Sequence, residues 1–154
     1  MTTPNLIPDL IRDEGERKFP YLDSMGIWTI GVGHNIEADA QMMPHLAALQ
    51  VAGITQDQIN QLLAEDIGRT EAGLDRMLPW WRQLDDVRQD AFVNLAFNLG
   101  DAKLATWHHT LADIQSGNFQ AAGVDLENDQ PWASQVHARA MRIALQIETG
   151  VHQP

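Results

Sequence analysis

Three side chains near the start of the chain have the types and spacing needed to cleave a glycosidic bond. Glu14 is followed nine positions later by Asp23, and Thr29 lies six positions beyond. Such hydrolysis uses one carboxylic acid to protonate the leaving oxygen and a second carboxylate to direct water or attack as a nucleophile. A Glu–Asp pair at a single spacing is common by chance. The argument therefore depends on the elements that hold these residues and on the Thr-Ile-Gly-Val-Gly-His run at 29–34.

An amphipathic helix is predicted in front of the first carboxylate. Ile7, Leu10, Ile11 and Glu14 recur at the spacing of one helical stripe, and Gly15 is a natural end. Glu14 would then lie on the inward face at the helix C-terminus, where burial and the helix dipole both raise a carboxyl pKa. A raised pKa suits a general acid near neutral pH, although most glutamates at helix ends are simply solvated.

Residues 19–35 read as strand and turn. A turn is predicted at Ser24-Met25-Gly26, and the run from Ile27 to His34 then alternates as a strand does. Alternation places Thr29, Gly31 and Gly33 on one face. Glycines weaken strands, so either a ligand such as a sugar ring approaches this backbone closely or the sheet bends here. Both interpretations remain open.

From about residue 38 onward the pattern is helical. Thr55-Gln56-Asp57-Gln58 has the form of a capping box in front of a long amphipathic helix. Asp66 lies on the apolar stripe of that helix, and an unpaired buried charge is very costly. Its candidate partners are His34 and Arg69.

The second half of the chain is predicted to be a group of helices. Asp85 or Asp86 caps a strongly apolar segment that ends at Gly100, and its hydrophobic character all round is typical of a central buried helix. Two shorter helices are predicted at 106–116 and 118–126, and a final helix at about 131–149.

Composition narrows the classes of function. The 154 residues predict one globular domain with 44% hydrophobic and 20% charged residues. The absence of cysteine excludes a disulfide framework, a thiol nucleophile and a cysteine-based zinc site. His108 and His109 are adjacent, so they would point in different directions on a helix, and no metal site is expected. No apolar run is long enough to predict a transmembrane helix.

The net charge of −11 argues against nucleic acid as a partner and disfavours adhesion to anionic membranes. The first residues lack the basic and apolar regions of a secretory signal. A target outside the cytoplasm would therefore require another route of delivery.

At this point the chain resembles a known family. Glu14, Asp23 and Thr29, with the following Gly-Val-Gly-His, are similar to the catalytic signature of phage-type lysozymes, glycoside hydrolase family 24. The Phe97-Asn98-Leu99-Gly100 segment also resembles that family, as does a C-terminal pattern of Trp132, Gln135, Arg139 and Arg142. The resemblance covers nearly the whole chain and is weak at 38–54 and 101–130.

The resemblance implies an α+β, mostly helical fold within a single domain, 1–154. A small N-terminal lobe with a β-sheet would span about 15–60, and a helical C-terminal lobe would span about 75–154 plus the first helix. The glycan would lie in a cleft between the lobes.

The same resemblance implies an inverting hydrolase that needs neither a cofactor nor a metal. It would cleave the β-1,4 bond of peptidoglycan between N-acetylmuramic acid and N-acetylglucosamine. Glu14 would be the general acid, Asp23 would orient a water and stabilise positive charge on the sugar, and Thr29 would help hold that water.

Further roles follow less directly. His34 and Asp66 would form a structural ion pair rather than a catalytic one, and a raised His34 pKa with a lowered Asp66 pKa would favour the folded state only between the two titrations. The candidate substrate-binding residues are Gly31, Asn98, Trp132, Gln135 and Arg139. For Trp132 ordinary burial is the stronger expectation, and Arg139 could pair with acidic side chains instead.

Two other functions remain as alternatives. A lytic transglycosylase needs one acid/base and no water-positioning carboxylate, so Asp23 and Thr29 argue against it. A non-catalytic, glycan-binding virion component has no use for the full set of three residues. A monomeric phage enzyme for host lysis would act at the cell wall in the periplasm. A free endolysin made in the host cytoplasm would need a pore-forming holin to reach the wall, whereas a virion-borne enzyme would not.

Overall fold

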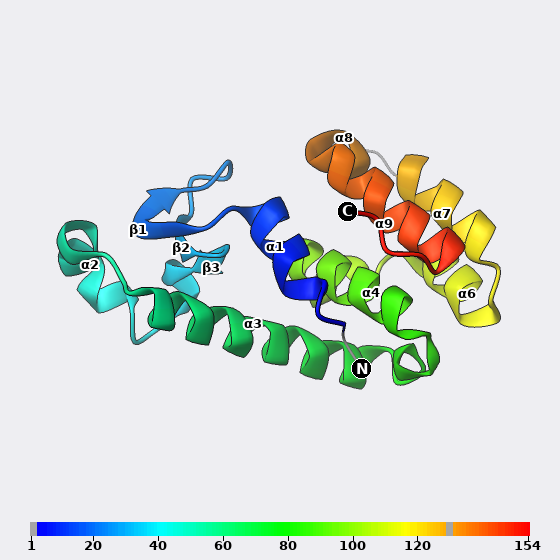
Figure 1. Ribbon diagram of the computed structural model, residues 1–154, viewed down its shortest axis with the longest axis horizontal. Helices are drawn as coiled ribbons and strands as arrows, with labels where there is room; N and C mark the ends of the chain where they lie inside the picture. Colours follow the sequence, from blue (N-terminus) through cyan, green and yellow to red (C-terminus); the bar gives the residue numbers. More distant parts are fainter. Residues whose placement is uncertain (1–2, 129–130) are drawn as a thin grey trace. The chain divides into compact units, whose positions relative to one another are not determined.

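The computed structural model describes residues 3–128 and 131–154, and it confirms the α+β, mainly helical fold (Figure 1). The chain forms two compact units. The smaller unit is Leu10–Gly68, and the larger comprises Met1–Asp9 and Arg69–Pro154. Helix α1 (Leu6–Glu14) divides between the units, so Glu14 belongs to the same unit as the sheet.

The stripe predicted for α1 is partly wrong. Ile7 is 49% exposed, whereas Leu6 and Leu10 are buried. The buried stripe therefore begins one residue earlier and also includes Asp9. Because α1 begins at Leu6, the positions one helical turn apart that face inward are Leu6, Asp9 and Leu10, and Ile7 faces outward. Asp9 is kept inside by a polar partner described below.

The smaller unit contains a three-stranded antiparallel sheet in the order β1-β2-β3. The strands are β1 (Arg17–Leu22), β2 (Trp28–Gly31) and β3 (His34–Asn35). The predicted first turn is present, with Gly26 at a φ of 77°. The predicted single run from Ile27 to His34 is wrong, because a second turn at 32–33 separates β2 from β3. Gly31 and Gly33 both have positive φ, which favours glycine at these positions.

Strand β1 is irregular between Arg17 and Tyr21, which lie opposite Gly31 and Thr29. Pro20 lies in this stretch and has no N–H to donate to the ladder. In the same stretch, the Lys18 carbonyl accepts a hydrogen bond from the Ile54 N–H at 2.9 Å, outside the β1–β2 ladder. The irregularity therefore places two residues of β1, four apart in sequence, opposite residues of β2 that are two apart.

The remainder of the smaller unit is helical. Two 3-10 turns, η1 (Ile36–Ala38) and η2 (Met43–His45), precede α2 (Leu46–Ala52) and the long α3 (Gln56–Met77). The predicted capping box is confirmed: the Gln58 N–H donates to Thr55 Oγ1 at 3.2 Å, and the Thr55 N–H donates to Gln58 Oε1 at 2.8 Å. The buried core consists of aliphatic side chains from several elements: Leu10, Ile30, Val32, Ile36, Ile54, Ile59 and Leu63.

The larger unit is organised around α4 (Asp86–Leu99), and the predicted central buried helix is confirmed. Asp85 is its N-cap and accepts a hydrogen bond from the Arg88 N–H at 3.0 Å, and Gly100 follows its last turn. Every residue from Gln89 to Ala96 is buried. Trp81, in η3 (Trp81–Gln83), is also fully buried and donates its indole N–H to Asp75 Oδ1 at 2.8 Å.

Short helices follow as α5 (Asp101–Leu104), α6 (His108–Ser116) and α7 (Phe119–Asn128). Two of these match predicted helices, separated as expected by Gly117, and α5 was not anticipated. The final helix predicted at 131–149 is wrong in one respect, because it breaks into α8 (Trp132–Val136) and α9 (Ala138–Thr149). The break is at His137, whose φ is 44°. No glycine or proline marks it in the sequence.

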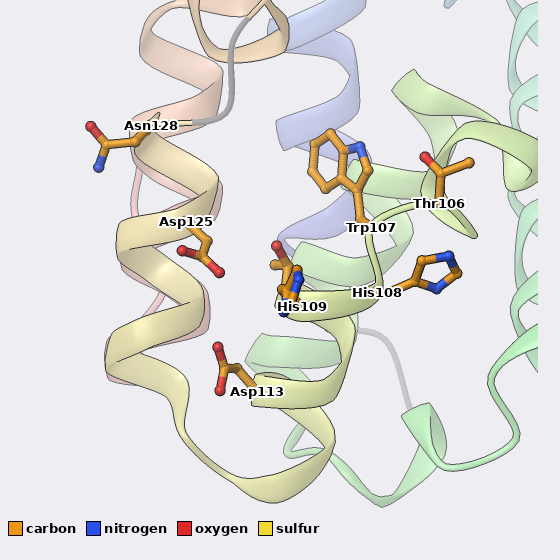
Figure 2. A pocket seen from close by; sticks show the side chains of 8 residues that line it. Thr106, Trp107, His108, His109, Asp113, Asp125 and Asn128 are labelled. Atoms are coloured by element: carbon orange, nitrogen blue, oxygen red, sulfur yellow. The ribbon is translucent and has the colours of Figure 1, made fainter.

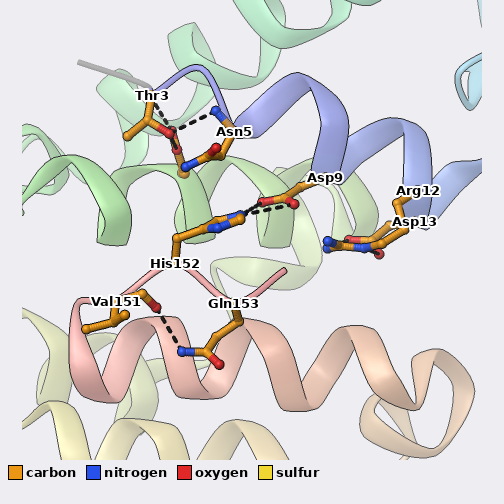
Figure 3. A network of polar contacts seen from close by, with 9 residues as sticks. Thr3, Asn5, Asp9, Arg12, Asp13, Val151, His152 and Gln153 are labelled. Atoms are coloured by element: carbon orange, nitrogen blue, oxygen red, sulfur yellow. Dashed lines mark hydrogen bonds and ion pairs between the residues drawn. The ribbon is translucent and has the colours of Figure 1, made fainter.

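Polar contacts tie both ends of the chain to the larger unit (Figure 3). Thr3 donates its N–H and its hydroxyl to the two carboxylate oxygens of Asp90 in α4. His152 Nε2 lies 3.0 Å from Asp9 Oδ2, and Figure 3 shows the imidazole pointing at that carboxylate. These contacts give the buried carboxylates of Asp9 and Asp90 the partners that their burial requires. No helix among the described residues has the length and apolar character to cross a membrane.

Candidate active site

Glu14 is the last residue of α1, and Gly15 follows it with a φ of 76°. Its carboxylate packs against the second hairpin turn. A Cβ built on Gly33 would lie 3.2 Å from Glu14 Oε2 and 3.3 Å from its Cδ. Such a contact is tighter than ordinary van der Waals packing, so the glycine gives the carboxylate its room. Gly31 and Gly33 were open to two interpretations, a bend of the sheet or a closely approaching ligand. The structure shows a turn at 32–33, and the side chain that approaches Gly33 closely is Glu14.

Asp23 begins the first hairpin turn, and the backbone of that turn fixes its carboxylate. Oδ1 accepts hydrogen bonds from the N–H groups of Met25 at 2.8 Å and Ile27 at 2.9 Å. An aspartate that bonds to the backbone just beyond it stabilises a tight turn and loses rotamer freedom. Oδ2 lies outside both of these bonds.

Thr29 lies in β2 and is 4% exposed. Its hydroxyl donates to the Ile27 carbonyl at 3.0 Å, so the same turn residue contacts both Asp23 and Thr29. The structure therefore couples two of the three predicted catalytic residues through the backbone of Ile27. All three, Glu14 included, belong to the smaller unit.

Tyr21 is a member of this cluster that sequence reasoning missed. It lies directly opposite Thr29 in the β1–β2 ladder. Burial raises the pKa of the Tyr21 phenol, the charge of Glu14 raises it further, Arg17 opposes this, and Asp23 adds to the increase. Both carboxylates thus act on one phenol. The signal was present in the sequence, because Tyr21 precedes Asp23 by two positions and residues two apart share a strand face.

His34 and Asp66 are brought together in the smaller unit. His34 Nδ1 lies 2.9 Å from Asp66 Oδ2, and Nε2 lies 3.2 Å from Asp39 Oδ2. Asp39, a second carboxylate partner, had no periodic pattern to reveal it. Burial disfavours ionisation of Asp39, but hydrogen bonds from Gln41, Met42 and His34 outweigh it and lower the pKa of that carboxyl. An imidazole facing carboxylates at both nitrogens donates to both only as the imidazolium.

The predicted substrate-binding residues occupy varied environments. Gly31 ends β2, and a Cβ there would meet Ile54 and Ile59 of the core at 3.9 Å. Trp132 is 1% exposed and donates its indole N–H to Asn98 Oδ1 at 2.9 Å, so these two residues lie together in the larger unit. Gln135 is exposed on α8.

Arg139 is buried in the larger unit, where its Nε donates to Asn94 Oδ1 at 2.8 Å. Its side chain therefore links α9 to the central helix. Substrate contact by Arg139, as by Gly31, Asn98, Trp132 and Gln135, remains a prediction.

A concavity of about 570 Å³ lies in the larger unit, between α6 and α7 (Figure 2). Its lining is mainly polar and combines hydroxyl, imidazole, carboxylate and amide groups with one indole: Thr106, Trp107, His108, His109, Thr110, Asp113, Asp125 and Asn128. Figure 2 shows the rings of His108 and His109 pointing in different directions, as their adjacency predicted. Among the described residues no group of three potential ligands could hold a metal ion.

The chemistry of the smaller unit is that of a carboxylate pair. Glu14 can supply a proton at one position, and Asp23, held by two N–H groups, can accept a hydrogen bond from water through its other oxygen. The Thr29 hydroxyl donates to the carbonyl of Ile27, the residue whose N–H binds this second carboxylate. These are the elements that glycosidic hydrolysis requires.

Comparison with known proteins identifies a family and several relatives. The family model described as "Phage lysozyme" matches residues 12–139 of the chain. That range contains Glu14, Asp23 and Thr29.

Three individual proteins are similar to this chain in sequence. The endolysin of Salmonella phage P22 is 34% identical over 118 residues, which cover 77% of this chain and 75% of the endolysin. The probable T4-type lysozyme 1 of Dictyostelium discoideum is 26% identical, with 94% of each chain covered. The pre-baseplate central spike protein Gp5 of Enterobacteria phage T4 is 28% identical over 92% of this chain, which spans only 27% of that longer protein.

Proposed function

The chain belongs to the phage lysozyme family and is therefore a peptidoglycan hydrolase. We propose that it cleaves the β-1,4 bond between N-acetylmuramic acid and N-acetylglucosamine. Glu14 protonates the leaving glycosidic oxygen. Asp23 accepts a proton from the attacking water and stabilises positive charge at the anomeric carbon. Thr29 holds the same water. The reaction inverts the anomeric carbon and uses no cofactor.

The observation that carries this proposal is that the backbone of Ile27 holds both Asp23 and Thr29, in the unit that also contains Glu14. Two backbone N–H groups hold Asp23 Oδ1, and the Ile27 carbonyl holds the Thr29 hydroxyl. A carboxylate and a hydroxyl held by one turn residue can bind a water through two hydrogen bonds, and inverting hydrolysis uses a carboxylate to activate such a water. A lytic transglycosylase would have no use for this pair.

Product analysis tests the proposal. Purified peptidoglycan is digested with the wild-type protein and with Asp23→Asn, and the products are identified by mass spectrometry. Reducing muramic acid ends are expected from the wild type. Anhydro-muramic ends would show transglycosylation instead, and the absence of products under conditions where the protein binds the glycan would show a binding role.

We also propose that the enzyme is a monomer that serves bacterial lysis by a phage at the cell wall. The likeness to a P22 endolysin supports a free enzyme that depends on a holin for access, whereas the likeness to a spike protein supports a virion-borne one. Expression in bacteria with and without a pore-forming holin separates the two. Lysis only with the holin is expected for an endolysin, and purified virions that carry the chain would overturn that assignment.

A further inference from the structure

Tyr21 is the only tyrosine of the chain, and the sheet places it with the carboxylate pair. It lies directly opposite Thr29 in the antiparallel ladder. Residues directly opposite one another project from the same face of a sheet. Tyr21 therefore shares the face of Thr29, and Asp23 follows two residues later at the start of the turn.

Arg17 covers the ring of Tyr21. Its guanidinium carbon lies 4.6 Å from the ring centroid, within the distance of a cation–π contact. This contact depends on the irregular stretch of β1, which brings Arg17 opposite Gly31 and Tyr21 opposite Thr29.

The phenol hydroxyl is available. Tyr21 is half-buried, and within residues 3–128 and 131–154 its hydroxyl makes no hydrogen bond. A partly buried tyrosine hydroxyl usually has a partner. Here its charged neighbours are Glu14, Arg17 and Asp23.

We propose that Tyr21 is a further substrate-binding residue, whose hydroxyl hydrogen-bonds an acetamido or hydroxyl group of the sugar bound beside Glu14 and Asp23, and that Arg17 positions its ring. This inference rests on the proposed function, because the ligand is the glycan of that reaction. The raised pKa of Tyr21 keeps the phenol protonated, and hence a donor, throughout the pH range in which a carboxylic acid can act as catalyst.

Steady-state kinetics on solubilised peptidoglycan fragments tests the contact. Tyr21→Phe removes only the hydroxyl, so we expect kcat/KM to fall about tenfold, as for loss of one substrate hydrogen bond, with an unchanged Tm. Arg17→Met should lower kcat/KM less, by about threefold, because the ring remains but is less well held. Lys18→Met is the matched control for loss of a positive charge on the same strand, and it should retain wild-type kcat/KM.

Tyrosine titration tests the geometry without depending on activity. Because the chain has one tyrosine, the phenolate absorbance near 295 nm reports Tyr21 alone. Glu14→Gln and Asp23→Asn should each shift this titration to lower pH. Glu65→Gln, an exposed acid of α3, should leave it unchanged.

The outcomes are distinguishable. If the wild type gives no cleavage products, the proposed function fails, and the titration still shows whether Tyr21 lies beside the two carboxylates. If the wild type cleaves peptidoglycan and Tyr21→Phe has the same kcat/KM, the substrate contact is refuted while the proposed function stands. A titration unmoved by both carboxylate variants would refute the arrangement itself.

Discussion

The two units of this protein are stabilised in different ways. The larger unit has a central helix with a continuous buried stretch from Gln89 to Ala96, and its fully buried side chains include Phe92, Trp81 and Trp132. The smaller unit has a short sheet, two glycine turns and a core of aliphatic side chains. The proposed catalytic residues lie in this smaller unit, where backbone hydrogen bonds orient Asp23 and Thr29. Large buried aromatic side chains therefore distinguish one unit, and turns that orient proposed catalytic groups distinguish the other.

The largest expected effect is a loss of activity without a loss of stability, caused by a substitution at Glu14 in the smaller unit. Glu14→Gln keeps the shape of the side chain and removes the acid, so activity on peptidoglycan should fall about 10³-fold, within the range for loss of a general acid. The Tm should stay within a few degrees of wild type. Turbidity assays on cell walls measure the activity, and near-normal turnover would remove Glu14 from its assigned role.

Truncation of a core side chain in the larger unit should lower stability and leave activity per folded molecule nearly unchanged. Phe92 is fully buried and makes an edge contact with Trp80. Phe92→Ala should lower the free energy of unfolding by about 3–5 kcal/mol, measured by urea denaturation, with little change in activity per folded molecule. Val124→Ala is the matched control, because Val124 is exposed on α7 and should change stability by less than about 0.5 kcal/mol. A Phe92 variant as stable as the control would contradict the comparison.

A glycine pair compares the two units at positive φ. Gly33 and Gly117 have φ values of 70° and 80°, and a Cβ meets Glu14 at Gly33 but open space at Gly117. Both alanine variants should lose about 1 kcal/mol of stability, because a positive φ strains alanine. Gly33→Ala should also reduce kcat about tenfold by displacing the Glu14 carboxylate. Equal kcat values for the two variants would show that Gly33 matters only as a turn.

The smallest expected effect depends on pH. The Asp39 pKa is lowered in the folded state, so Asp39 stabilises that state above its unfolded pKa, and this contribution is lost as pH falls through the folded pKa. Asp39→Asn should therefore reduce stability by about 1 kcal/mol near pH 6 and by less near pH 3. Thermal melts at both pH values, with Glu65→Gln as the control, measure the difference. A deficit that grows on acidification would reverse the assigned sign.

Sequence reasoning succeeded where a local pattern determines local structure. The capping box at Thr55 and Gln58, the cap at Asp85 and the buried character of α4 all follow from short-range chemistry that the sequence displays. The Asp66 partner was limited to two candidates because a carboxylate on an apolar stripe needs one.

Other features depend on contacts that no local pattern reveals. The run from Ile27 to His34 alternates like one strand, and only the pairing of β3 with β2 shows that it turns at Gly33. His137 breaks the last helix without a glycine or proline, so the sequence gives no signal. Asp39 faces His34 from an irregular segment. The spacing of Tyr21 and Asp23 is visible in the sequence, but the position of Tyr21 opposite Thr29 depends on the pairing of β1 with β2.

The stereochemistry of the first product tests the central claim most directly. The wild-type enzyme is incubated with soluble peptidoglycan fragments, and proton NMR follows the anomeric signal of the newly formed reducing end before it equilibrates. If Glu14 is the acid and Asp23 directs a water, the β bond is inverted and the α anomer appears first. The β anomer appearing first would show retention, which would make Asp23 a nucleophile and contradict the account.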